Sequence, residues 1–169
     1  RALIKEWFPQ LPSQFIHVDV ATGTGLVVKL LMEEVKKTKR KGLIIGVDPN
    51  KDSLAVARKT IHSTKEILIE FIEGLGQNLV VLLRGKILPD EADGVSIHDA
   101  IHEIKGKENK IAVLNAMRNM LKKGGVLSLN SSFTRESMDR KSQLEWGTWR
   151  KRVKELLHLE RNRQEEQVT

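Results

Sequence analysis

The chain has 169 residues, 40% hydrophobic and 30% charged, which is ordinary for one globular domain with a single core. Cysteine and tyrosine are both absent, which excludes disulfides, thiolate zinc sites, thiol nucleophiles and a tyrosyl acid or base. No apolar run is long enough to span a membrane and no signal-peptide pattern opens the chain, so we expect a cytoplasmic protein without a membrane span.

The net charge of +7 is unevenly distributed. The cations gather in two groups, Lys36, Lys37, Lys39, Arg40 and Lys41, and then Arg150, Lys151, Arg152 and Lys154. A basic run is usually a solvated surface, and cations also favour the C-terminal end of a helix. Nucleic-acid binding stays open on charge alone but is not favoured.

Short β-branched runs alternate with stretches whose apolar residues recur at helical spacing. In chain order, the expected elements are a short amphipathic segment at 2–8, a strand at 15–20, a helix at 26–37, a strand at 43–47, a helix from 52 or 53 to 63, a strand at 67–72, a short helix at 77–83, a strand at 94–98, a helix at 110–122, a strand at 126–129 and a helix at 143–159. We expect Asp52 or Ser53 to cap the helix that ends at 63, with Val56 facing inward, and Gly124-Gly125 to end the helix at 110–122.

This alternation predicts an α/β fold: a Rossmann-like, doubly wound parallel sheet with strand order 3-2-1-4-5 and helices on both faces. Ligands of such sheets bind beyond the carboxyl ends of the strands, near the point where the strand order reverses. The loops after Val20, Val47, Ile72 and His98 are therefore the expected site. The basic run at 36–41 precedes a strand, so we expect it at the opposite edge.

The first motif is residues 17–25 (HVDVATGTG), where a strand runs into a tight glycine turn and then a helix. Gly23 and Gly25 let the backbone approach a ligand, and the helix N-terminus offers free N–H groups. Asp19 ends the strand, where its carboxylate can accept from an ammonium group. Val28 stands where a dinucleotide fingerprint has its third glycine, and Asp19 would oppose a pyrophosphate, so a dinucleotide is disfavoured. An ordinary strand-to-helix turn is the alternative.

The second motif is residues 46–50 (GVDPN), at the end of the next strand. Asp48 can accept from both hydroxyls of a ribose, as the acid after the second strand does in nucleotide-binding folds. The alternative is that the Asp or Asn of this motif is a helix N-cap.

Together with residues 71–76 (FIEGLG), 93–103 (DGVSIHDAIHE) and 121–127 (LKKGGVL), these motifs resemble in order and spacing those of class I S-adenosylmethionine-dependent methyltransferases. Together the matches run from about residue 15 to 133, and residues 19–25 are similar to those of the ubiquinone and menaquinone biosynthesis methyltransferases and their relatives. The chain departs from their pattern at Ala21, where relatives carry a glycine, and at Lys123, where they carry proline. Leu75 replaces an acid that meets the adenine amino group.

The resemblance implies S-adenosylmethionine as the cofactor, with Asp48 on the ribose and Pro49 on the adenine. The cofactor-binding residues that it implies are Asp19, Ala21, Thr22, Gly23, Gly25, Asp48, Pro49, Gly74, Leu75, Gly76 and His98. A hydroxyl or protonated amine acceptor needs a base, and the candidate catalytic residues are His98, Asp99 and His102. For His102 a packed or surface histidine is the alternative. No metal is expected.

Relatives continue into an antiparallel strand pair, and the sequence after residue 134 shows no such pair. We therefore expect a cofactor-binding core at 1–133 and a charged helical segment at 134–169, in a fragment or truncated form that lacks the following region. Trp146 and Trp149 give that segment an apolar side. Oligomers can form through this helix or through an exposed sheet edge.

The favoured interpretation is a methyltransferase that acts on a small-molecule acceptor. An RNA methyltransferase is the second interpretation, and only the basic groups support it. The third is a non-catalytic cofactor-binding or interaction domain, supported by Leu75 and the missing end. The absence of an N-P-P-Y-like tetrad at the fourth strand disfavours amino methylation of adenine or glutamine.

Overall fold

The computed structural model describes residues 2–86 and 88–131. In chain order its elements are α1 (Ala2–Trp7), the 3-10 helix η1 (Phe8–Gln10), β1 (Gln14–Val20), α2 (Leu26–Val35), β2 (Lys41–Asp48), α3 (Lys51–Thr60), β3 (Ile67–Glu73), the 3-10 helix η2 (Gly76–Asn78), α4 (Leu79–Gly85), β4 (Ala92–His98), α5 (Lys107–Met120) and β5 (Leu121–Asn130). The predicted helix at 143–159, with Trp146, Trp149 and the second basic group, lies outside the described residues.

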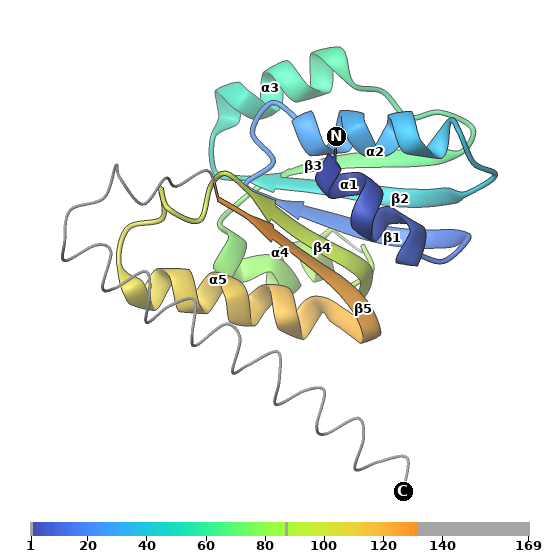
Figure 1. Ribbon diagram of the computed structural model, residues 1–169. Helices are drawn as coiled ribbons and strands as arrows, with labels where there is room; N and C mark the ends of the chain where they lie inside the picture. The colour runs from blue at the N-terminus through green and yellow to red at the C-terminus, as the bar shows by residue number, and fades with distance from the viewer. Residues whose placement is uncertain (1, 87, 132–169) are drawn as a thin grey trace, which may run out of the picture. The chain divides into compact units, whose positions relative to one another are not determined.

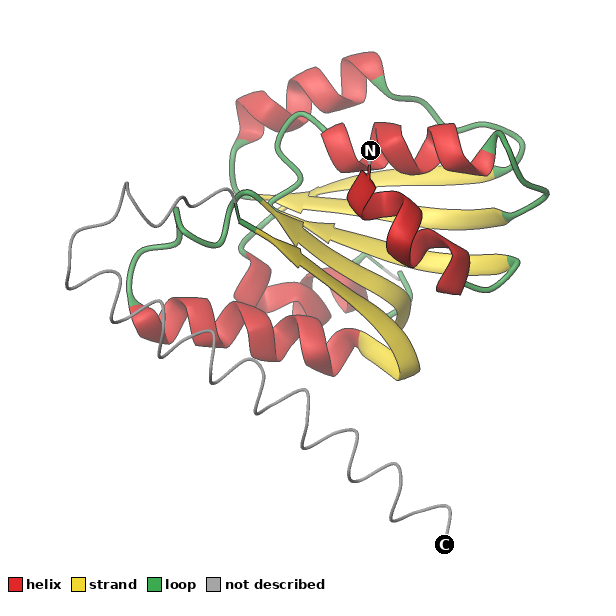
Figure 2. Ribbon diagram, in the orientation of Figure 1, coloured by secondary structure: helices red, strands yellow, loops and turns green. Residues whose placement is uncertain are grey.

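Five parallel strands form one sheet in the order β3-β2-β1-β4-β5 (Figure 1). Helices α1, α2 and α3 lie on one side of the sheet, and α4 and α5 lie on the other (Figure 2). This arrangement confirms the predicted α/β fold and strand order. Val20 is paired with Val47 of β2 and with Ile97 of β4, so the strand order reverses at the carboxyl end of β1.

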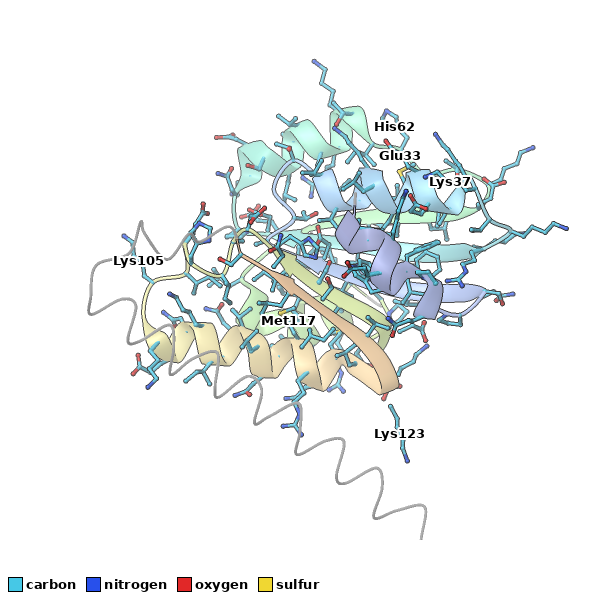
Figure 3. The ribbon with its side chains drawn as sticks, viewed as in Figure 1. Glu33, Lys37, His62, Lys105, Met117 and Lys123 are labelled. Atoms are coloured by element: carbon cyan, nitrogen blue, oxygen red, sulfur yellow. The ribbon has the colours of Figure 1, made fainter. Side chains whose placement is uncertain are left out.

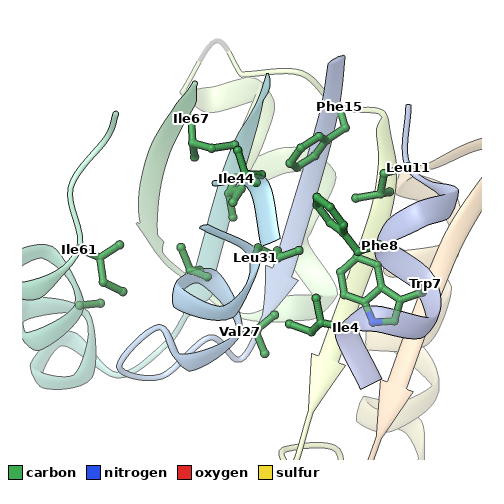
Figure 4. Close-up of a cluster of buried hydrophobic side chains, with 13 residues drawn as sticks. Ile4, Trp7, Phe8, Leu11, Phe15, Val27, Leu31, Ile44, Ile61 and Ile67 are labelled. Carbon is green, nitrogen blue, oxygen red and sulfur yellow. The ribbon is translucent and has the colours of Figure 1, made fainter. Parts of the chain in front are cut away.

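The sheet is apolar because helices cover both of its faces. On the face toward α1 and α2, aromatic and aliphatic side chains form one buried cluster, labelled in Figure 4, that includes Ile4, Trp7, Phe8, Leu11, Phe15, Val27, Leu31, Ile44, Ile61 and Ile67. The rings of Phe8 and Phe15 meet edge to face with centroids 6.1 Å apart. Burying each side chain of this size contributes about 1.5–3 kcal/mol, so the residues before β1 are part of the core.

The start of α3 differs from the prediction. Its cap is Asn50, whose side-chain oxygen accepts from the backbone N–H of Ser53 at 3.0 Å, and not Asp52 or Ser53. This is the N-cap that the alternative interpretation of residues 46–50 offered. Val56, expected to face inward, is 47% exposed, because Leu54 and Ala57 carry the buried side of this short helix.

The boundary between α5 and β5 also differs. The helix ends at Met120, and Gly124-Gly125 lie inside β5 instead of ending the helix. The pairing of β4 with β5 is irregular here, since residues 122–125 stand opposite Asp93 alone, and Gly124 has a φ of +76°. A strand bulge and a helix C-cap both favour glycine at positive φ, so the sequence pattern does not separate them.

The basic run at 36–41 connects α2 to β2 at the amino edge of the sheet, where the parallel strands begin. Figure 3 shows Lys37 at the end of α2 remote from the strand arrowheads, and Lys123 at the same edge. Arg40 is not simply solvated: its guanidinium donates to the carbonyls of Phe8 and Pro9 and lies 5.0 Å from the centroid of the Phe8 ring. Through these contacts Arg40 links the residues before β1 to the start of β2.

No helix within the described residues is both long and apolar enough to cross a membrane.

Candidate ligand-binding site

The turn between β1 and α2 needs backbone angles that L-residues seldom adopt. Ala21, Gly23 and Gly25 have φ values of 55°, 54° and 82°. A left-handed conformation costs a residue with a side chain about 1–2 kcal/mol, so Ala21 holds a glycine-like position at some strain. One backbone bond lies within the turn, from the N–H of Gly25 to the carbonyl of Thr22 at 2.8 Å, and another joins the turn to β2, from the N–H of Thr22 to the carbonyl of Val47 at 3.1 Å.

The two glycines of this turn serve different purposes. A Cβ atom on Gly25 would lie 2.3 Å from Cδ1 of Ile61, so it would displace that side chain, and the φ of +82° disfavours any side chain here as well. A Cβ atom on Gly23 would meet no atom within 4 Å. The backbone at Gly23 therefore borders open space, as the close approach of a ligand requires.

Asp48 joins three loops at the carboxyl edge of the sheet, where the parallel strands end. Its Oδ2 accepts from the N–H of Gly23 at 2.8 Å, and its Oδ1 accepts from the N–H of Asn50 at 2.8 Å. The N–H of Gly74 donates to its backbone carbonyl at 3.1 Å. The loops after β1, β2 and β3 therefore meet at one residue, which is 7% exposed.

Asp19 lies deeper, at 1% exposure. Its Oδ2 accepts from the hydroxyl of Thr22 at 2.7 Å, and its Oδ1 accepts from the hydroxyl of Ser96 at 2.6 Å. Burial raises the pKa of the Asp19 carboxyl to about 6, although the hydrogen bonds from Ser96 and Thr22 act in the opposite direction. The nearby charge of Asp48 adds to the increase. Asp19 is a buried anion at pH 7 that becomes neutral in mild acid.

Behind Asp19 lies a histidine that the sequence prediction missed. Nε2 of His17 is 2.8 Å from Oγ of Ser96, and its ring stacks on Trp7 with centroids 4.9 Å apart. His17 is fully buried, and this burial lowers its pKa to about 3, with His98 adding to the decrease, so the ring is neutral at pH 7. The available signal was the pair of polar residues, His17 and Asp19, two apart on one face of an otherwise apolar strand.

Leu75 and its flanking glycines form the loop after β3. A Cβ atom on Gly74 would lie 2.4 Å from the Leu82 side chain, and one on Gly76 would lie 2.7 Å from the Val20 side chain, so either would have to displace its neighbour. Leu75 is 47% exposed, and its carbonyl accepts from the N–H of Asn78 at 2.9 Å. Pro49 is exposed and follows Asp48 directly.

His98 ends β4, the strand beside β1, and is partly buried. Its Nε2 lies 2.9 Å from Oγ of Ser128. Burial lowers the pKa of His98, although the charge of Asp99 acts in the opposite direction. His98 therefore lies at the same edge as the acids, with a ring that is neutral at pH 7.

The other two catalytic candidates are placed differently. Asp99 has a φ of 52°, and its N–H donates to the carbonyl of Asn130 at 2.9 Å. Nδ1 of His102 lies 3.3 Å from Oγ of Ser131, and its Nε2 lies 3.9 Å from the Glu103 carboxylate. The structure thus gives both residues contacts within the loop after β4 and at the end of β5.

Acids dominate the ends of the first three strands. Asp19 is the last residue but one of β1, Asp48 ends β2 and Glu73 ends β3. The nearby cation, Lys51, lies 3.6 Å from the Glu73 carboxylate. Within the part of the chain that the structure describes, no three His, Asp or Glu side chains are grouped to hold a metal ion.

Comparison with known proteins finds one matching family and several solved structures with this fold. The family model of the methyltransferase domain matches residues 18–125, which include the glycine turn and all of β2, β3 and β4. No curated protein sequence matches the chain.

Several solved structures share the fold. A chain in the complex between the Haloferax volcanii Trm112 methyltransferase activator and the putative methyltransferase is 22% identical, with a TM-score of 0.51 over 74% of this chain and 49% of that chain. A SAM dependent methyltransferase from Archaeoglobus fulgidus is 20% identical, with a TM-score of 0.50 over 72% of this chain and 46% of that one. The glycopeptide N-methyltransferase MtfA complexed with S-adenosyl-L-homocysteine is 16% identical, with a TM-score of 0.53 over 75% and 50%. The chain spans about half the length of these structures.

Proposed function

Because the chain belongs to the methyltransferase domain family, we propose that it transfers a methyl group from S-adenosylmethionine to a small-molecule acceptor. The observation that carries this proposal is the contact between Asp48 and the glycine turn, which joins the two loops expected to hold the ribose and the methionine part. Both loops lie at the carboxyl edge, beside the point where the strand order reverses.

The charges of this edge fit S-adenosylmethionine better than a dinucleotide. The N–H of Gly23, which would face a pyrophosphate, is taken by the Asp48 carboxylate. A pyrophosphate would also meet the charges of Asp19 and Glu73, with Lys51 already placed on Glu73. S-Adenosylmethionine carries an ammonium group and a sulfonium and has no phosphate, so acids at the strand ends favour it.

Each residue then has a proposed part in binding. The oxygens of Asp48 each accept one N–H, which leaves lone pairs for the two ribose hydroxyls. Asp19 supplies negative charge for the ammonium group. Pro49 and Leu75 offer apolar surface to the adenine, and the open space beside Gly23 admits the methionine part.

When bound, the cofactor supplies an electrophilic methyl group on a sulfonium. The chain's task is to align the acceptor with that group and to exclude water. We assign His98 as the base that takes the acceptor's proton, because its lowered pKa leaves one ring nitrogen unprotonated at pH 7. Ser128 fixes the orientation of the ring through Nε2.

The place of the basic run supports a small acceptor. Residues 36–41 lie at the amino edge of the sheet, and a nucleic acid held there would face away from the proposed methyl-transfer site. Of the two basic groups that favoured RNA, the described one therefore gives no support.

Calorimetric titration with S-adenosylhomocysteine, with NAD as the comparison ligand, tests the cofactor. We expect S-adenosylhomocysteine to bind and NAD not to bind. Binding of NAD alone contradicts the proposal, and binding of neither ligand favours a domain that has lost the cofactor. An electrophoretic mobility shift of RNA by the protein that weakens with added salt would favour an RNA acceptor over a small-molecule acceptor.

Replacing Leu75 with aspartate should tighten the complex with S-adenosylhomocysteine roughly three- to tenfold, because it restores an acceptor for the adenine amino group, less the cost of desolvating the carboxylate. Leu75→Ala is the control, since it removes the apolar side chain without adding an acceptor, and it should give no gain. A looser complex in the aspartate variant would mean that this loop recognises adenine through apolar contact.

A further inference from the structure

We propose that His17 and Ser96 are positioning residues of the cofactor site, forming a buried relay that holds the Asp19 carboxylate in place beneath the glycine turn. This inference rests on the proposed function, which assigns Asp19 to the ammonium end of the cofactor. Neither residue belongs to the set that the sequence motifs imply.

The pairing of β1 with β4 brings the relay together. Asp19 is the register partner of Ser96, and His17 is the partner of Gly94. His17 and Asp19 are two residues apart in one strand, so their side chains lie on the same face, toward Ser96. The relay continues from Asp19 to the hydroxyl of Thr22, inside the glycine turn. A chain of hydrogen bonds of 2.8, 2.6 and 2.7 Å therefore links the buried histidine to the ligand loop.

The direction of the relay follows from a count of protons. The hydroxyl of Ser96 has one proton and donates it to Oδ1 of Asp19, since a carboxylate has none to give. Ser96 must then accept from His17, so the proton of His17 is on Nε2. Nδ1 is left bare, and it is a buried atom with no hydrogen-bond partner among the described residues. A Cβ atom on Gly94 would lie 2.7 Å from this nitrogen, so the glycine gives the ring its room.

At pH 7, where Asp19 is ionised, the neutrality of His17 keeps a single proton on its ring, so the direction is fixed. Burial holds its pKa at about 3, far below the ordinary value of 6.5, so the ring gains no second proton in mild acid. The stack on Trp7 holds the ring plane, with 13° between the two planes. The imidazole therefore acts as a rigid donor that aims the Ser96 hydroxyl at Asp19.

The relay bears on binding because a buried carboxylate needs its donors. Without Ser96, Asp19 keeps the donor of Thr22 alone, and its pKa rises above the present value of about 6. A larger share of the protein then carries a neutral Asp19 at pH 7. Two charged or titratable groups also act on the relay, Asp48 from β2 on Asp19 and His98 from β4 on His17, and Ser96→Ala leaves both in place.

The test compares two ligands by calorimetry between pH 5.5 and 8. S-Adenosylhomocysteine has the amino-acid end that Asp19 would meet, and 5′-methylthioadenosine lacks it. For Ser96→Ala we expect roughly tenfold weaker binding of S-adenosylhomocysteine at pH 7 and an upward shift of the pH midpoint of binding. Binding of 5′-methylthioadenosine should stay within about twofold of the wild type, since one lost buried hydrogen bond to Asp19 does not reach the nucleoside end.

Ser63→Ala is the matched control. Ser63 lies in the loop before β3, at the amino edge of the sheet, and its hydroxyl accepts from the N–H of Ile69. This variant should change neither ligand's affinity. Equal losses for both ligands with an unmoved midpoint would show a merely structural role and overturn the relay. Failure of wild-type protein to bind S-adenosylhomocysteine would overturn the proposed function and the relay with it.

Nitrogen NMR of His17 in wild-type protein gives a second readout that needs no ligand and no variant. We expect a neutral ring at both pH 7 and pH 5, with its proton on Nε2 at pH 7, where Asp19 is ionised. A proton on Nδ1 at pH 7, or an imidazolium at pH 5, would overturn the relay whatever the stability of Ser96→Ala.

Discussion

Replacing Asp48 with alanine should weaken binding of S-adenosylhomocysteine by about 100-fold, since hydrogen bonds to a charged group contribute about 1.5–3 kcal/mol and the loops lose their common partner as well. The N–H groups of Gly23 and Asn50 both donate to this carboxylate, so the variant leaves the glycine turn and the cap of α3 without it. We also expect a loss of about 1–3 kcal/mol in the free energy of unfolding.

Calorimetry on three variants separates these contributions. Asp48→Asn keeps one acceptor oxygen and should fall between the wild type and Asp48→Ala. Asp90→Ala removes an exposed carboxylate from the loop before β4, where it pairs with Arg84, and should leave the affinity unchanged. Unchanged affinity in Asp48→Ala would show that the ribose role is wrong.

The second large effect is expected at Asp19, where Asp19→Asn should stabilise the fold at pH 7 while weakening the binding of S-adenosylhomocysteine. In the folded protein the pKa of this carboxyl is about 6, raised from 3.8 mainly by burial. The difference corresponds to about 3 kcal/mol of destabilisation once the carboxyl is ionised in both states. The amide has no such penalty, although one of its N–H groups must find an acceptor, so about 3 kcal/mol is the upper bound of the gain.

The sign of the pH dependence follows from the two buried groups. Because the folded pKa of Asp19 is raised, its contribution to stability is fully present below about 4 and is lost as the pH rises through about 6. His17 acts the other way, since its folded pKa is about 3 and its unfolded value is 6.5, so it removes stability as the pH falls from 6.5 toward 3. Asp19→Asn removes the first dependence and keeps the second.

Urea unfolding of wild type and Asp19→Asn at pH 4.5, 6 and 7.5 measures this difference. We expect the advantage of the variant to be largest at pH 7.5 and to shrink toward pH 4.5. Asp52→Asn is the control, because the Asp52 carboxylate lies exposed in the first turn of α3. Its free energy of unfolding should differ little from that of the wild type at any pH. Parallel pH curves for the wild type and Asp19→Asn would mean that the Asp19 carboxyl titrates like an ordinary surface acid.

The sequence predicts the sheet well because its signals are local. Each strand is a short apolar run, and the handedness of parallel crossovers then restricts the strand order to a few arrangements. The start of β5 was wrong for a physical reason: Gly124 has positive φ in a bulge opposite Asp93, a conformation that equally suits the end of a helix. The favoured position for the cap of α3 was wrong by two or three residues, because Asn50, Asp52 and Ser53 are all good capping residues.

The candidate site likewise has parts that the sequence could predict and parts that it could not. The glycine turn and Asp48 could be predicted because their chemistry follows from strand ends and short spacings. The partner of His17 could not, since Ser96 is 79 residues away and meets it only through the register of β1 on β4. The contact of Arg40 with Phe8 joins residues 32 apart in the sequence, and the composition of a basic run does not indicate it.

The N-terminal segment has a practical consequence for anyone who excises this domain. Family similarity begins at residue 18, but Ile4, Trp7, Phe8 and Leu11 are already buried. A protein cut at the start of that similarity would lose residues 14–17 of β1, His17 among them, and open an apolar face on the sheet, and such faces promote aggregation. The domain that folds cooperatively therefore begins N-terminal to the segment that matches the family model. An expressed version of the domain should include these buried N-terminal residues.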